Sequence, residues 1–195
     1  MFKLYSPARA ERLLRDHASM IDTSARRYGV PGAVLRAILY KELTEIDLFD
    51  IFADLAVAFY WLRCDLRKAP PRLTRGVFGK RDSSTGWAQI FAYVAIRALC
   101  EAHSRGLPVP DAPDPESTAE LGRVWRRLRR DRAFNLDCCA LNLLSCALEM
   151  TGRYSFDGCT EPELKRILTR YNADTDRVTP YGEAAYRHYL RYLSE

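Results

Sequence analysis

The amino-acid sequence predicts a mainly α-helical fold. Apolar residues recur at helical spacing along almost the whole chain, and no stretch alternates apolar and polar residues for long enough to indicate a strand. The length of 195 residues and the apolar content of 48% suit a globular protein with one substantial core. We therefore expect one domain over residues 1–195.

Glycines and prolines divide the first half of the chain into its expected elements. These are a helix from Pro7 to Tyr28, a helix from Pro31 to Glu42, a helix from Ile46 to Arg63, a loop or short β-hairpin over residues 72–85, and a helix from Gly86 to His103. The helix from Ile46 to Arg63 is too apolar to be exposed on all sides. The loop that follows it is rich in glycine, serine and charge, so a site could form there.

The second half begins with a proline-rich connector and continues with helices. The expected elements are the connector from Leu107 to Glu116, a basic helix capped by Ser117, a strongly apolar core helix from Asn135 to Met150, a helix opened by a Thr160–Glu163 capping box, and a final helix carrying Tyr181, Ala185, Tyr189 and Leu193. No internal repeat interrupts this order.

The charge balance favours an anionic partner. The net charge is +5, and much of the excess lies between Arg123 and Arg132, where Trp125 and Leu128 mark one apolar edge of a helix. We interpret this helix as a solvated face whose arginine stems cover apolar surface. Nucleic-acid binding is the less favoured alternative, because the run has no zinc-ligand spacing and no clear helix-turn-helix partner.

Membrane insertion, metal binding and disulfides are not expected. The longest apolar run, Leu55 to Leu62, is too short to cross a bilayer, and the N-terminal region turns charged too early for a secretory signal peptide. The six cysteines lack Cys-x-x-Cys spacing and the three histidines are scattered, so we interpret the cysteines as small buried thiols in a reducing compartment. No cofactor is predicted.

Glu42 is the first candidate for chemistry. It shares a helix face with Leu35, Ile38 and Leu39, so a carboxyl group is expected among buried side chains. Burial raises the pKa of a carboxylic acid, which suits a general acid that must hold its proton near neutral pH. The alternative is a half-solvated glutamate at the helix end that pairs with Lys41 or an arginine.

Four segments, in order, resemble the lysozyme-like superfamily, above all the lytic transglycosylases and goose-type lysozymes. Val30 to Glu42 is similar to the family's catalytic helix, and Ser83 to Phe91 is similar to its Gly-Leu-Met-Gln loop. Asn135 to Leu144 resembles its core helix, and Tyr171 to Ala173 resembles its Tyr-Asn-Ala-Gly motif. The resemblance implies a lysozyme-like helical domain that cleaves peptidoglycan in a bacterial or phage setting.

The resemblance also implies a set of site residues. Glu42 would protonate the glycosidic oxygen between N-acetylmuramic acid and N-acetylglucosamine of a peptidoglycan strand. The residues expected to line the substrate groove are Ser84, Gly86, Gln89, Tyr171 and Asn172. For Gln89 and Tyr171 the alternatives are a glutamine that braces its own loop and a tyrosine in the core. Proton transfer to a glycosidic oxygen requires no metal.

A second carboxylate would serve hydrolysis. Asp82 is the best candidate, because it lies just before the loop, near the place where goose-type enzymes hold an aspartate that positions water. Asp47 and Glu45 are alternatives. Lytic transglycosylases work without such a residue, since the substrate's N-acetyl and 6-hydroxyl groups complete the reaction, so hydrolysis and transglycosylation both stay open.

The chain also departs from the family pattern. Leu43 follows the glutamate where the family usually has serine, Cys139 replaces a core-helix glycine, and Asp174 replaces the last glycine of the Tyr-Asn-Ala-Gly motif. The insert between Glu42 and Gly86 is long enough to reshape or cover the cleft. These departures keep a second function open, an inactive lysozyme-like domain that binds glycan or protein.

Because no signal peptide is expected, the protein is expected to be made in the cytoplasm and to reach the cell wall through a holin or a secretion system.

Overall fold

The mainly α-helical fold is confirmed by a computed structural model that describes residues 3–67, 80–109 and 112–194. Within these ranges the helices are α1 (Pro7–Asp16), α2 (Ala18–Tyr28), α3 (Gly32–Glu45), α4 (Leu48–Arg67), α5 (Ala92–Ser104), α6 (Thr118–Arg130), α7 (Arg132–Thr151), α8 (Glu161–Asn172) and α9 (Pro180–Leu193). The described β structure consists of two isolated bridges, Lys3 with Asp47 and Thr85 with Ile90.

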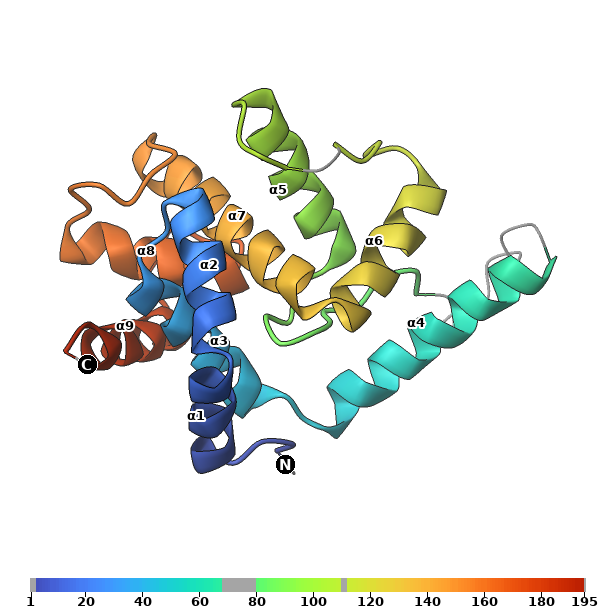
Figure 1. The fold of residues 1–195 in the computed structure, drawn as a ribbon, viewed down its shortest axis with the longest axis horizontal. Coiled ribbons are helices and arrows are strands. Elements are labelled where there is room, and N and C mark those ends of the chain that lie inside the picture. The colour runs from blue at the N-terminus through green and yellow to red at the C-terminus, as the bar shows by residue number, and fades with distance from the viewer. Residues whose placement is uncertain (1–2, 68–79, 110–111, 195) are drawn as a thin grey trace.

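Helix α7 forms the centre of the molecule (Figure 1), as the apolar run from Asn135 to Met150 predicted. It packs against α2, α5, α6 and α8, and Leu136, Leu141 and Leu143 are fully buried. By length and composition alone α7 could cross a membrane, but 67% of its most apolar window is buried inside the protein. A core helix passes the same test, so this property is weak evidence of a membrane span.

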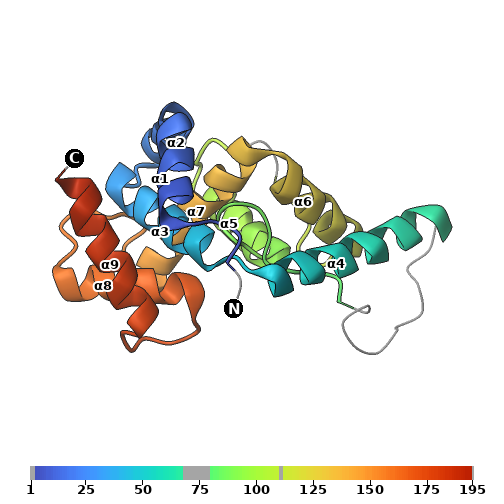
Figure 2. The same ribbon diagram turned by 90° about the horizontal axis from the view of Figure 1, so that it is seen from below.

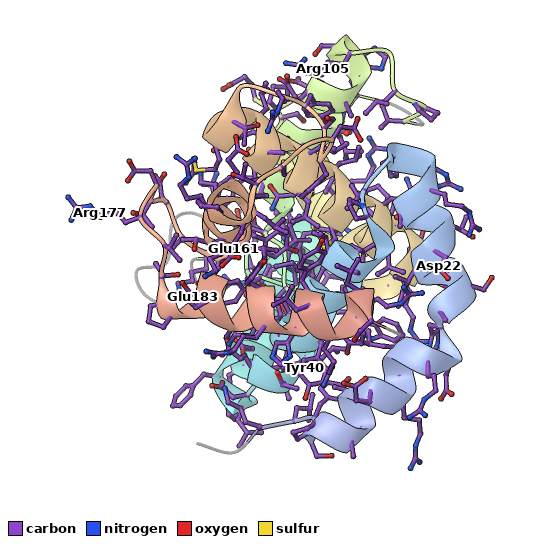
Figure 3. All side chains as sticks on the ribbon, turned by 90° about the vertical axis from the view of Figure 1, so that its left-hand side faces the viewer. Asp22, Tyr40, Arg105, Glu161, Arg177 and Glu183 are labelled. Atoms are coloured by element: carbon purple, nitrogen blue, oxygen red, sulfur yellow. The ribbon has the colours of Figure 1, made fainter. Side chains whose placement is uncertain are left out.

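Helix α9 closes the other side of the molecule. It packs on α3 and α8, and Figure 3 shows it lying across the front with Tyr40 of α3 beside it. The Tyr40 ring lies 4.5 Å from the His188 ring and 6.3 Å from the Tyr192 ring, measured between centroids. These ring contacts hold the second half of α9 against α3 at Tyr40. Because Glu42 follows two residues later, they also position Glu42 relative to α9.

The helix ends follow local capping rules. Ser117 caps α6 by accepting a hydrogen bond from the Glu120 N–H (3.3 Å), and Thr160 with Glu163 forms the predicted capping box of α8. Gly29 ends α2 in the left-handed conformation, at φ 69°. These boundaries depend on neighbouring residues only, which is why the sequence predicted them.

Two predicted boundaries were wrong. The helix expected from Pro7 to Tyr28 breaks at His17, where φ is −117° and ψ is 17°, and becomes α1 and α2. The helix expected from Gly86 begins only at Ala92, because Gly86 (φ 74°) and Gln89 (φ 43°) are left-handed and hold residues 86–90 in a turn. The expected hairpin over residues 72–85 falls mostly outside the described residues, and from residue 80 its only β pairing is the Thr85–Ile90 bridge.

The basic helix α6 has the predicted buried edge. Trp125 and Leu128 are each 1% exposed. The guanidinium of Arg129 lies 5.6 Å from the Trp125 ring centroid, and that of Arg126 lies 5.8 Å from the ring of Trp61 on α4. These contacts agree with the interpretation that the arginine stems cover apolar surface.

Candidate active site

A groove of about 910 Å³ runs along the meeting point of α3, α5, α7, α8 and the loop before α5. Its lining includes five of the predicted site residues, Glu42, Ser84, Gln89, Tyr171 and Asn172. They come from three segments that are far apart in the sequence. The fold thus brings the last turn of α3, the loop and the end of α8 together around one concave surface.

Glu42 opens into this groove from an apolar setting. Only 7% of the residue is exposed, as its position on the apolar face of α3 predicted. The pKa of Glu42 is raised from 4.5 to about 7: burial is the largest cause and the negative charge of Asp50 adds to it, whereas the Tyr181 hydrogen bond and the Lys41 charge lower the pKa. A carboxyl group with this pKa carries its proton over much of the range up to neutral pH.

Tyr181 orients the Glu42 carboxyl. It lies in the first turn of α9, and its hydroxyl donates a hydrogen bond to Glu42 Oε1. Burial and the neighbouring carboxyl raise the pKa of Tyr181, so the phenol stays protonated and remains a donor. Among the described residues none hydrogen-bonds Glu42 Oε2, which leaves that oxygen to carry the proton. Sequence reasoning placed Tyr181 only as a member of the final helix.

The ion pair considered for Glu42 forms elsewhere. The Lys41 ammonium pairs with Glu45 one turn further along α3, and it lies 5.0 Å from the Tyr181 ring centroid. Burial lowers the pKa of Lys41. Because Lys41 neutralises Glu45, Glu42 is left with a hydroxyl partner in place of a cation, which keeps its pKa high.

The loop from Ser83 to Ile90 is held rigidly against α4 and α6. Asp54 of α4 accepts hydrogen bonds from the Ser83 hydroxyl (2.6 Å) and the Thr85 hydroxyl (2.7 Å). The indole Nε1 of Trp125 donates to Ser83 Oγ at 3.0 Å. Ser83 and Thr85 are buried, and these bonds fix the loop that forms one wall of the groove before any ligand binds.

Gly86 has a structural role that differs from the predicted one. It is not among the described residues that line the groove. A Cβ at this position would lie 2.3 Å from Asn135 Nδ2 and 2.8 Å from the Leu128 carbonyl oxygen. Buried Asn135 occupies that space and ties the loop to α7, accepting from the Ala88 N–H (2.9 Å) and donating to the Thr85 carbonyl (3.2 Å). The missing side chain at Gly86 therefore makes room for Asn135 and the Leu128 carbonyl of the protein itself, and Gly86 does not line the groove as predicted.

Gln89 and Ser84 support each other at the edge of the groove. Gln89 Nε2 donates to the Gly86 carbonyl at 2.8 Å, and its Oε1 accepts from Ser84 Oγ at 3.3 Å. Gln89 thus braces its own loop, which was one of the two predicted roles, and it also lines the groove. The second role, contact with a ligand, stays a prediction.

Tyr171 joins α8 to the loop and to α7. Its hydroxyl lies 2.7 Å from the Ala88 carbonyl, to which it donates, and 3.3 Å from Cys139 Sγ. The tyrosine is therefore bound into the interior by its hydroxyl while part of its surface lines the groove. Asn172, one residue further, is exposed at the groove's edge.

Asp82, predicted as a second carboxylate, lies outside the groove lining and caps α5. Its two oxygens accept from the N–H groups of Ala92 and Tyr93, both at 3.0 Å. Asp47, an alternative, accepts from the Phe49 N–H at the start of α4 (2.8 Å), and it lines the groove together with the other alternative, Glu45. The carboxylate whose charge raises the pKa of Glu42 is Asp50, which lines the groove and was not predicted.

The departures from the family pattern lie in two settings. Leu43 and Cys139 are fully buried in the core, whereas Asp174 is exposed and pairs with Arg170.

Compared with known proteins, the chain matches no family model, no curated protein and no solved structure.

Proposed function

We propose that this chain is a peptidoglycan-cleaving glycosidase of the lysozyme-like kind, with Glu42 as its general acid. The observation that carries the proposal is a buried carboxyl group with a pKa of about 7 that opens into a groove of about 910 Å³. Such a pKa is matched to proton donation near neutral pH. The four sequence segments that resemble lytic transglycosylases and goose-type lysozymes name the substrate class.

The chemistry assigns one oxygen of Glu42 to each task. Oε1 accepts from Tyr181, so Oε2 holds the proton and delivers it to the glycosidic oxygen as the bond from that oxygen to the sugar C1 breaks. The carboxylate that results then takes a proton from the nucleophile that bonds to C1. That nucleophile is water in hydrolysis, or the 6-hydroxyl of the same sugar in formation of an anhydro product.

Aromatic side chains at the groove suit a carbohydrate. Phe91 and Tyr93 line it, are 39% and 53% exposed, and hold their ring centroids 5.6 Å apart. Exposed rings beside hydrogen-bonding groups such as Gln89 and Asn172 provide apolar contact for sugar faces and polar contact for their hydroxyls. A polymer of sugars needs both kinds of contact.

The test is digestion of purified peptidoglycan by the wild type and by the Glu42→Gln variant. We expect muropeptides from the wild type and a loss of at least about 100-fold in rate for Glu42→Gln, as for removal of a general acid. Glu183→Gln on α9, a glutamate that pairs with Lys165 and is not among the groove-lining residues, is the control and should retain activity. Mass spectrometry of the products separates hydrolysis from anhydro-sugar formation. Equal digestion by wild type and Glu42→Gln would contradict the proposal.

A glycan-binding domain without catalysis is the second candidate, and core residue Leu43 in place of the family's serine favours it. That function predicts binding of the wild type and Glu42→Gln to insoluble peptidoglycan with similar affinity and no release of fragments by either. Co-sedimentation measured beside the digestion distinguishes the two functions.

A further inference from the structure

Helix α4 carries a row of exposed apolar side chains, which we call the outer stripe. It consists of Leu48, Phe52, Leu55, Phe59, Leu62 and Leu66, each between 45% and 75% exposed. Successive members are separated by four, three, four, three and four residues. Phe49, at 74% exposure, lies beside its first member. So large an apolar row on the surface is unusual and marks an interaction site.

The opposite face of α4 is fixed to the protein. Val57, Tyr60 and Trp61 are buried, and Trp61 packs so closely on α6 that a Cβ on Gly122 would lie 2.7 Å from its ring. Trp61 Nε1 also donates to the Arg81 carbonyl at 3.0 Å. Figures 1 and 2 show α4 running outward along the edge of the molecule, away from α8 and α9. Turning the outer stripe inward would break these contacts.

The spacing of the outer stripe fits one partner helix. Alternating steps of three and four residues keep apolar side chains on the narrow seam at which two helices pack in a coiled coil. A helix that lies on a membrane has a wider apolar face flanked by many lysines and arginines. Here Arg63 is the only basic residue among positions 48–66, so the stripe lacks the flanking cations of a membrane-bound helix.

The stripe is symmetric about Val57. An antiparallel second copy, related by a two-fold axis beside Val57, would place Leu48 against Leu66, Phe52 against Leu62, and Leu55 against Phe59. Every layer then pairs two large apolar side chains.

The area that the pair would bury agrees with this arrangement. Large side chains exposed to this degree contribute on the order of 100 Å² each, so the stripe and Phe49 together bury about 1,400 Å² in the pair. Stable protein interfaces bury roughly 1,200–2,000 Å².

We propose that the outer stripe of α4 binds the outer stripe of a second copy of this chain in antiparallel orientation, forming a two-fold symmetric dimer. The proposal is independent of the function of the groove. Because Asp50, in the first turn of α4, lines the groove, the dimer holds its two grooves at opposite ends of the α4 pair. With about 1.5 Å per residue, positions 48 and 66 are about 27 Å apart along the axis.

The oligomeric state tests the interface. We expect sedimentation equilibrium of the full chain at micromolar concentration to give a dimer, and Leu55→Glu, which places charge next to the two-fold axis, to raise the dimer Kd at least about tenfold. Leu190→Glu on α9, where the leucine is 46% exposed, is the matched control and should leave the dimer intact. Circular dichroism establishes that each variant is folded.

A pair of complementary variants tests the orientation. Phe52→Lys and Leu62→Glu should each weaken the dimer alone, and an equal mixture should recover it, because antiparallel packing puts the lysine opposite the glutamate. A parallel pair puts neither charge opposite the other, so absence of recovery would overturn the antiparallel arrangement. A wild type that stays monomeric would overturn the proposal. A monomeric wild type that binds phosphatidylcholine–phosphatidylglycerol vesicles through the stripe would also overturn the proposal, since the partner of the stripe would then be a membrane.

Discussion

Replacing Glu42 by glutamine should stabilise the protein at alkaline pH and have little effect at acid pH. In the folded protein the pKa of Glu42 is about 7, against an ordinary value of 4.5. Between these values the folded state binds more protons than the unfolded state, so the free energy of unfolding falls as pH rises. At about 1.4 kcal/mol per pH unit, the wild type loses about 3 kcal/mol of stability by pH values above 7. Glutamine keeps an acceptor for Tyr181 and does not titrate.

Urea unfolding of the two proteins at several values from about pH 4 to about pH 8 measures this difference. The free energy of unfolding of Glu42→Gln minus that of the wild type should be smallest at the acid end and rise by about 3 kcal/mol across the interval. Glu45→Gln, whose glutamate is exposed and ion-paired, supplies the control. A difference that does not change with pH would show that Glu42 titrates normally, and the argument for a proton-holding acid would then fail.

Three further predictions concern Tyr181, which bonds Glu42, and the loop before α5. Tyr181→Phe removes the hydrogen bond that lowers the pKa of Glu42, so the alkaline limb of kcat/KM against pH should move to higher pH; movement to lower pH would contradict the assigned bond. Gly86→Ala should lower the free energy of unfolding by about 2 to 4 kcal/mol, because a methyl group clashes there and φ is positive. Gly106→Ala, also at φ 74° but in open space, should cost about 1 kcal/mol, and equal losses in urea unfolding would refute the packing argument. Asp82→Asn should lower stability by about 1 to 2 kcal/mol through the α5 cap while kcat/KM stays within about twofold, and a large loss of kcat/KM would restore a catalytic role for Asp82.

Features that depend on neighbouring residues were predictable from the sequence. The caps at Ser117 and Thr160 and the burial of Glu42 follow from spacing within one helix, and the structure confirms them. The break at His17 was not predictable, because nothing in the local sequence interrupts the helical pattern there. The left-handed conformation of Gln89 was also not predictable, because the chain reverses at this loop to meet α7.

Tyr181 and the orientation of α4 lie beyond sequence reasoning for a different reason. Tyr181 meets Glu42 across 139 residues, and only the packing of α9 on α3 brings the two side chains together. In α4, apolar residues occur on both faces, so the pattern predicts burial without saying which face the body of the protein covers. Trp61 and Gly122 decide that question by their fit. Asp82 was misassigned because sequence proximity to the loop does not reveal which way its carboxylate turns.

The digestion of purified peptidoglycan by wild type and Glu42→Gln tests the central claim most directly. We predict release of soluble muropeptides by the wild type and by Glu183→Gln, and a loss of at least about 100-fold for Glu42→Gln in a protein that is folded and still binds the polymer. Release of the same fragments at the same rate by Glu42→Gln would contradict the claim that the buried carboxyl group of α3 is the acid of this groove.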